Sequence, residues 1–168
     1  MTDPLPTDPI AEAHRQWVAH GWEDAADGMA LVTAIMRTQQ VLLNRIEKVL
    51  SPFGLTFARY ELLTLLSFTR HGALPMAKAS ARLQVHPTSV TNAVDRLEQA
   101  GLVARTSHPT DGRMTLVEIT RDGRALAKEA THELNTEVFA DPGFGNAEIG
   151  ELNRMLENFR RSAGDFGT

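Results

Sequence analysis

The 168-residue sequence contains no cysteine, and this absence excludes several kinds of chemistry at once. Without thiols the chain forms no disulfide, builds no thiolate zinc site and does not sense oxidants through a cysteine. It also lacks an apolar run of the roughly 18 residues that a membrane-spanning helix needs. The first residues, MTDPLPTDP, show no basic stretch followed by an apolar core. We therefore expect no signal peptide, no membrane partner and a cytoplasmic protein.

Sequence motifs of catalysis and metal binding are missing as well. The chain has no glycine-rich phosphate loop, no nucleophile elbow and no HExxH motif. His14 and His20 share an expected helix but stand six residues apart, whereas metal ligands on one helix usually stand about three or four apart. We expect a structural or surface role for both histidines. The sequence thus predicts a protein that is not an enzyme and holds neither metal nor cofactor.

The sequence does have an uneven distribution of charge. The overall net charge of −4 argues at first against a nucleic-acid partner. However, residues 1–30 hold six acidic residues against one basic residue, and residues 114–168 hold ten against six. Residues 59–113 reverse this balance with seven Lys or Arg against four acidic residues, and they add three histidines. Because phosphate binding needs a local basic face rather than a basic whole, the central segment is the candidate binding region.

Apolar spacing, capping residues and turn residues predict a mainly helical fold with a small β-hairpin. A single hairpin is only marginally stable by itself, so we expect it to pack on the helices or to have an external role. The expected helices are 9–20, 24–50, 57–69, 76–83, 87–100, 121–139 and 146–162, and the expected strands are 102–106 and 114–120.

The expected helix 87–100 carries the strongest functional signal. Val90, Val94 and Leu97 recur at i, i+4 and i+7 and form one apolar face, and the opposite face is polar, with short side chains near its start. Short side chains and a helix N-terminus that attracts phosphate suit insertion into a major groove. There Asn92 matches adenine, and Arg96 can reach guanine or phosphate. An ordinary surface helix with a solvated polar face explains the same pattern. The predicted DNA contacts are His86, Pro87, Thr88, Ser89, Thr91, Asn92 and Arg96.

The expected hairpin tip, residues 107–113, is polar and basic. Asp111 stands two residues before Arg113, where its carboxylate could hold the guanidinium by a charge-assisted bond. An arginine held on a thin loop is suited to probing a minor groove. The alternative is a plain turn with a local ion pair. Because a recognition-type helix and a basic hairpin tip follow each other directly, DNA binding explains the pair better. We expect Gly112 to belong to this contact and His108 to touch phosphate.

Between residues 74 and 120 the chain resembles the DNA-binding region of the MarR family of bacterial regulators. Flanking helices in the same order extend the resemblance to residues 25–162. It implies a winged helix-turn-helix domain at 56–120, a helical dimerisation region at 24–55 and 121–168, and an N-terminal arm with an extra helix at 1–23. The matching residues are Val90-Thr91, Val94-Asp95-Arg96-Leu97-Glu98, Gly101-Leu102-Val103, Asp111-Gly112-Arg113, Ile119-Thr120 and Gly123.

The resemblance also implies a homodimer on double-stranded DNA. The operator would be pseudo-palindromic, with half-sites about one helical turn, ~34–36 Å, apart. It implies insertion of Arg113 into a minor groove, and Lys78 and Arg105 could add phosphate contacts. Expected residues of the dimer interface are Leu31, Ile35, Leu152, Leu156 and Phe159.

The leading hypothesis is a sequence-specific transcriptional regulator, a repressor, that a small aromatic or anionic ligand releases from its operator. Trp17, Trp22, Tyr60 and Phe68 could line a pocket for such an effector, although packing in the core or dimer interface is the alternative. An architectural DNA binder of low specificity is a second hypothesis. The acidic ends argue against it, since nonspecific binding relies on broad phosphate neutralisation. A third hypothesis is a winged-helix module that binds proteins.

Overall fold

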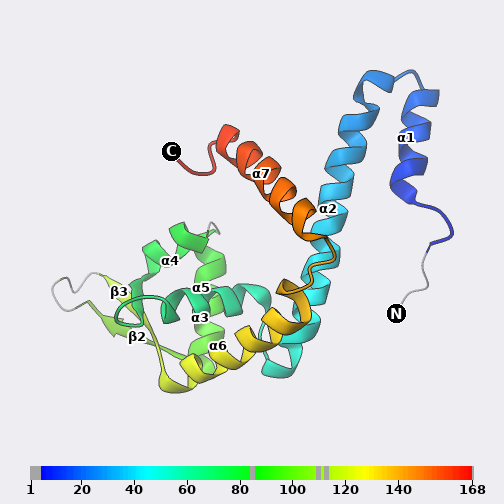
Figure 1. Cartoon of the computed structure of the whole chain (residues 1–168). Coiled ribbons are helices and arrows are strands. Elements are labelled where there is room, and N and C mark those ends of the chain that lie inside the picture. Colours follow the sequence, from blue (N-terminus) through cyan, green and yellow to red (C-terminus); the bar gives the residue numbers. More distant parts are fainter. Residues whose placement is uncertain (1–4, 84–85, 109–110, 112–113, 168) are drawn as a thin grey trace.

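The structure, a computed structural model, describes residues 5–83, 86–108, 111 and 114–167 and is mainly helical with a three-stranded antiparallel sheet. A long helix, α2, rises out of a lobe that contains α3 to α6 and the sheet (Figure 1). The elements are α1 (Pro9–Ala19), α2 (Glu23–Leu50), the 3-10 turn η1 (Ser51–Phe53), α3 (Phe57–Ser67), β1 (Ala73–Pro75), α4 (Met76–Leu83), α5 (Pro87–Gln99), β2 (Val103–Ser107), β3 (Thr115–Ile119), α6 (Arg121–Leu134), the π-helical turn η2 (Asn135–Phe139) and α7 (Asn146–Ser162).

Side-chain caps explain where several helices begin. The Asp8 carboxylate accepts a hydrogen bond from the backbone N–H of Ile10, at the start of α1 (3.0 Å). The Thr56 hydroxyl caps α3 in the same way. Thr120 does so for α6, with the backbone N–H of Gly123 as donor (3.0 Å). These bonds satisfy N–H groups that have no partner inside a helix, which fixes each start to one residue.

The sheet has the order β1-β3-β2, with β3 in the centre. Val117 of β3 lies opposite Leu74 of β1 and Arg105 of β2. The strand β1 is a correction to the sequence analysis, which expected two strands. With three residues that run straight into α4, β1 is too short to show the alternation of apolar and polar residues that marks a strand.

The core lies where the C-terminal end of α2 meets α3, α5, α6 and β3. Tyr60 is buried there, and its hydroxyl lies 3.1 Å from the Thr131 hydroxyl of α6. The expected apolar face of α5 is confirmed, because Val90, Val94 and Leu97 are all buried. Burial of α5 against α3 and the sheet leaves its opposite face outside. The largest fully buried side chains are Leu50, Leu62, Leu63, Leu66, Leu97, Leu134, Val90, Val94 and Val117.

The expected helix 121–139 is divided in the structure. Regular α-helix ends at Leu134, and the π-helical turn η2 follows. The Arg45 guanidinium, on α2, donates hydrogen bonds to the backbone carbonyls of Glu137 (2.9 Å) and Asp141 (2.7 Å). Both carbonyls lie beyond the last regular turn of α6, so Arg45 ties η2 and the segment after it to α2.

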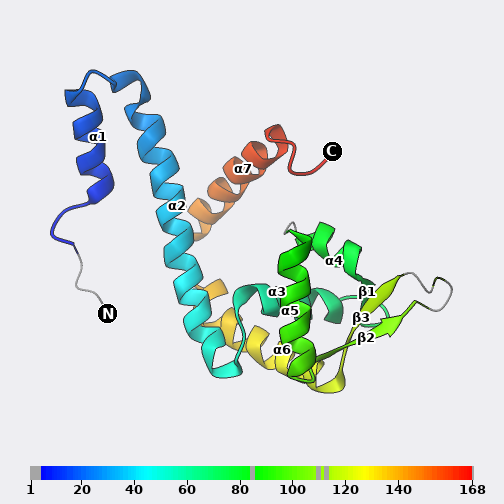
Figure 2. The same cartoon turned by 180° about the vertical axis from the view of Figure 1, so that it is seen from behind.

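Outside the lobe, the helices expose much apolar surface. α1 lies antiparallel beside the N-terminal part of α2, and α7 leaves the middle of α2 on the other side (Figures 1 and 2). Every residue of α7 is at least partly exposed. A groove of about 530 Å³ runs between α2 and α7. Exposed apolar residues of α2 and α7 include Leu31, Val32, Ile35, Met36, Leu152, Met155, Leu156 and Phe159.

Among the described residues the structure has no helix both long and apolar enough to cross a membrane.

Candidate nucleic-acid interface

The outer face of α5 is polar along its whole length. Thr88, Ser89, Thr91, Asn92, Arg96 and Gln99 are exposed on the side away from the core. A shallow hollow of about 440 Å³ is lined by Asn92, Asp95, Arg96 and Gln99. Amide and guanidinium groups there can form paired hydrogen bonds with base edges in a major groove. The structure therefore brings together Thr88, Ser89, Thr91, Asn92 and Arg96 on one open surface, and the Pro87 side chain lies outside what the structure describes.

His86 has a structural task at the start of α5. Its Nδ1 accepts a hydrogen bond from the backbone N–H of Thr88 (3.3 Å) and lies 3.1 Å from the Thr88 hydroxyl. Because Nδ1 acts as the acceptor, the proton of the neutral ring lies on Nε2. Nε2 can therefore still donate to a phosphate while Nδ1 caps the helix. The helix begins at Pro87, as the sequence predicts.

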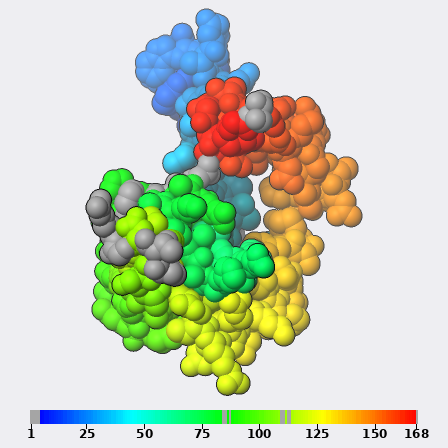
Figure 3. Space-filling view, turned by 90° about the vertical axis from the view of Figure 1, so that its left-hand side faces the viewer, coloured from blue at the N-terminus to red at the C-terminus, as the bar shows by residue number. Residues whose placement is uncertain are grey.

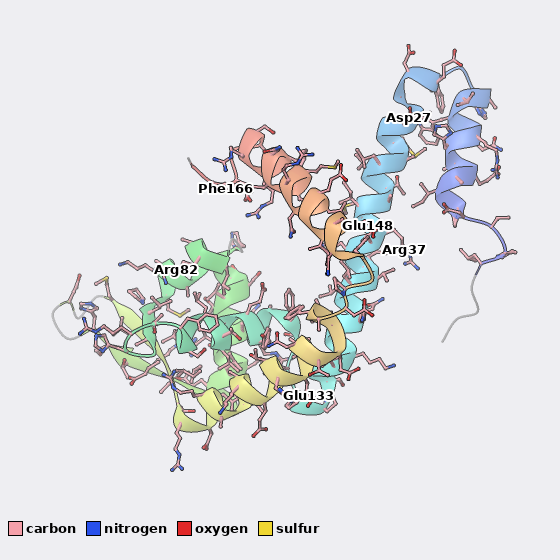
Figure 4. All side chains as sticks on the ribbon, in the orientation of Figure 1. Asp27, Arg37, Arg82, Glu133, Glu148 and Phe166 are labelled. Carbon is pink, nitrogen blue, oxygen red and sulfur yellow. The ribbon has the colours of Figure 1, made fainter. Side chains whose placement is uncertain are left out.

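Basic side chains on α4 extend this surface. Lys78 is exposed, as a phosphate contact must be. Arg82, one helical turn later, is exposed too and points outward from the lobe (Figure 4). Arg82 was not predicted as a contact, although its i+4 spacing from Lys78 places both cations on one side of the helix. Two exposed cations thus lie on the helix that precedes α5.

The wing consists of β2, β3 and their connection. Its two strands lie at one end of the lobe in Figure 1, and this end faces the viewer in Figure 3. The backbone N–H of His108 donates to the Met114 carbonyl, and the N–H of Met114 donates to the Asp111 carbonyl, both at 3.0 Å. Gly112 and Arg113 lie outside the described residues. The orientation of Arg113 by Asp111 therefore stays a prediction.

Arg105 of β2 binds two acidic side chains of α5. A phosphate contact was predicted for it from the sequence and stays a prediction, whereas in the structure its guanidinium binds Asp95 and Glu98. Its backbone N–H also donates to Glu98 Oε1 (2.9 Å). Hydrogen bonding to Asp95 and Glu98 raises the pKa of the Arg105 guanidinium above its usual value, against the effect of desolvation. With donors turned toward two carboxylates, Arg105 joins β2 to α5, and its side chain stays partly exposed.

The four aromatic residues expected around an effector do not meet. Trp17 and Trp22 pack edge to face at the α1–α2 turn, with ring centroids 5.4 Å apart. Tyr60 is buried in the core and stacks on Phe57. Phe68, at the end of α3, is 81% exposed. Local packing therefore explains Trp17, Trp22 and Tyr60, and the four residues do not line one pocket within the chain.

A helix pair with an exposed polar second helix, followed directly by a β-hairpin, defines the winged helix-turn-helix class of DNA-binding proteins. The MarR family model matches residues 53–114. The structure is similar to that of Sco5413, a MarR family transcriptional regulator from Streptomyces coelicolor, with a TM-score of 0.76 and 48% identity over 84% of this chain and 99% of that one. The chain belongs to the MarR family of transcriptional regulators.

Two further proteins are similar. Rv2887, an HTH-type transcriptional repressor of Mycobacterium tuberculosis, is 34% identical over 105 residues, which cover 62% of this chain and 74% of the relative. The crystal structure of a mutant MarR from E. coli in complex with operator DNA matches with a TM-score of 0.73 over 80% of this chain and 96% of that one, at 21% identity. That last likeness shows the fold alone. The chain is a DNA-binding transcriptional regulator of a non-enzymatic family.

Proposed function

We propose that the chain is a sequence-specific repressor that binds a pseudo-palindromic operator as a homodimer, with α5 in the major groove and the wing in the minor groove. The observation that carries this proposal is the outer face of α5. It is open and polar, and it presents Asn92 and Arg96 beside the wing. Two copies related by a two-fold axis would read two half-sites about one helical turn, ~34–36 Å, apart.

The unburied apolar surface of α2 and α7 supports a homodimer. Leu31 and Ile35 of α2 are 63% and 48% exposed, and Leu156 and Phe159 of α7 are 45% and 71% exposed. An amphipathic helix gains most of its stability by burying its apolar face. A second copy that covers this surface would supply that burial for both helices. The names of the repressor relative and of the operator complex agree with a repressor on operator DNA.

The candidate site for an effector is the groove between α2 and α7, and not a pocket of the four aromatic residues named from the sequence. Its lining is almost wholly apolar and includes Ile46, Phe57, Phe144 and Leu152. We propose that a small aromatic ligand binds at the end of this groove beside Ile46 and Phe57, next to the surface assigned to the second copy, and changes the packing of α7 on α2. Ligand sites of this kind are concave and mostly apolar, with few polar groups. A titration of aromatic carboxylates into the protein–operator complex tests this, and no release by any of them contradicts it.

Fluorescence anisotropy with the promoter DNA beside the gene tests the main proposal. We expect binding at least about 10³-fold tighter than to a scrambled duplex at the same salt concentration. Arg113→Ala should weaken operator binding by about 1–3 kcal/mol. Arg154→Ala removes the same charge from the exposed surface of α7 and is the matched control. Equal affinity for the scrambled duplex would overturn the proposal in favour of an architectural DNA binder.

A further inference from the structure

The strand β2 is an edge strand, and its outer edge faces α5. In the order β1-β3-β2, β2 pairs with β3 on one side only. On the other side, the backbone N–H of Arg105 donates to Glu98 Oε1 of α5 (2.9 Å). An edge N–H without a partner would be left to solvent or to another chain. Glu98 of α5 thus supplies the acceptor that a neighbouring strand would otherwise offer to this N–H.

The Arg105 side chain strengthens the same connection. Its guanidinium binds Glu98 through one terminal nitrogen and Asp95 through the other. The two carboxylates stand three residues apart on α5, so both face β2. Arg105 is 28% exposed, compared with 46% for Asp95 and 38% for Glu98. Charge-assisted bonds to a planar guanidinium are directional, so they fix an angle as well as a distance. We call these three residues the Arg105 clamp.

The clamp joins the two elements proposed to enter DNA. α5 presents Asn92 and Arg96, and β2 leads into the wing tip with Arg113. A protein that uses a major-groove helix and a minor-groove arginine must hold the two at the separation that adjacent grooves require. The clamp connects Asp95 and Glu98 of α5 to Arg105 of β2, the strand that leads into the wing tip.

We propose that Arg105 is a positioning residue for DNA recognition, which sets the wing at a fixed angle to α5 through Asp95 and Glu98. The inference rests on the proposed function, because it requires both elements to contact one operator. The proposal also explains why Asp95 and Glu98 lie so close to the DNA-facing surface. A carboxylate beside the DNA-facing surface repels phosphate, and Arg105 neutralises part of that charge while it uses both groups as anchors.

The first test removes the charge of Glu98 and asks whether operator affinity rises or falls. Glu98→Gln removes one negative charge near the DNA, which by electrostatics alone should tighten binding. If the clamp positions the wing, operator affinity should instead fall about fivefold or more. Glu118→Gln removes the same charge from the exposed face of β3 and is the control, with equal or slightly tighter binding expected. Tighter binding by both variants would overturn the proposal.

A double-mutant cycle separates positioning from a direct phosphate contact. Arg105→Met keeps an apolar stem and removes the guanidinium, and we expect it to weaken operator binding roughly tenfold without a change in the salt slope. In the Arg113→Ala background the same substitution should cost much less, because there is no wing arginine left to position. Equal costs in both backgrounds, with a salt slope smaller by about one, would assign Arg105 to phosphate and overturn the proposal.

Hydrogen exchange of the DNA-free protein tests the clamp itself. Because the Arg105 amide donates to Glu98, its protection should fall in Glu98→Ala, which has no side-chain acceptor at this position, while amides of α3 keep theirs. Loss of protection throughout α3 would show general unfolding, and the operator affinity of Glu98→Gln would then carry the test. Unchanged protection of the Arg105 amide would overturn the clamp. If the wild-type protein fails to distinguish operator from scrambled DNA, the proposed function fails, whereas this exchange result still reports on the clamp.

Discussion

The residue with the best position to read a base is Asn92, in the middle of the open face of α5. Asn92→Ala should relax the preference for one base pair per half-site by about 1–3 kcal/mol, because a carboxamide can bond two edge atoms of adenine at once. Binding to operators already altered at that base pair should hardly change. Anisotropy over a set of single-base operator variants measures this. A uniform loss across all variants would place Asn92 on the phosphate backbone instead.

Glu61 of α3 makes the folding stability of the protein depend on pH. Burial raises the pKa of its carboxyl above the usual value. In the folded protein Glu61 thus holds its proton to higher pH than in the unfolded chain. Stability is intact below the unfolded pKa and falls as pH rises through the folded pKa, where the carboxylate must ionise in a partly desolvated position.

Glu61→Gln should therefore unfold at higher temperature than wild type at pH 7, and the difference should vanish below about pH 4, where glutamate is protonated in both states. Thermal unfolding followed by circular dichroism across this pH range measures the effect. Glu129→Gln, on the exposed surface of α6, is the control for loss of a charge. A difference that persists at low pH would mean that the amide gains stability by another route.

At the scale of elements, the junction of the wing with α6 depends on a close approach at Gly123. A Cβ at this position would lie 2.0 Å from the Leu102 carbonyl oxygen and 3.0 Å from Ile119 Cγ1. The Thr120 hydroxyl fastens the same junction, since it donates to the Gly101 carbonyl (2.8 Å) and caps α6. Because the first obstacle is backbone, a side-chain rotation cannot relieve it.

Gly123→Ala should destabilise the lobe by about 3 kcal/mol or more, since an overpacked site forces the backbone to move. The free energy of unfolding from urea titration measures it. Gly150 provides a matched control within α7, because a Cβ there meets nothing within 4 Å. Gly150→Ala should be neutral or stabilising by up to about 1 kcal/mol. Similar effects of the two substitutions would contradict the proposed contact at Leu102.

At this scale the sequence could predict features that depend on residues close together in the chain, and it could not predict those that depend on distant residues. The buried face of α5 repeats every three to four residues, and the start of α6 at Thr120 rests on neighbouring residues, so both were predictable. The strand β1 was not, because its three residues gain their strand structure from β3, more than 40 residues later in the chain. The role of Arg105 was equally hidden. Its partners are on another element, and a basic residue near a wing suggests phosphate until its neighbours are known.

At the scale of the whole molecule, α2 and α7 present an apolar surface that a folded lobe alone does not cover. If a second copy covers it, a charge at its centre should separate the copies. Leu156 belongs to the exposed apolar face of α7, at 45% exposure, and Asn158 is exposed on another side of the same helix. The two positions therefore allow the same new charge to be placed within and outside the proposed interface.

Leu156→Glu should convert the dimer to a monomer at micromolar concentration, because a buried unpaired carboxylate is costly. Operator affinity should then fall by roughly 10² or more, since the second half-site is no longer bound intramolecularly. Asn158→Glu should remain dimeric and bind as the wild type does. Light scattering after size exclusion gives the mass, and anisotropy gives the affinity. A monomeric mass with undiminished affinity would show that one lobe suffices for recognition, and a dimer disrupted by Asn158→Glu alone would move the interface to the other side of α7.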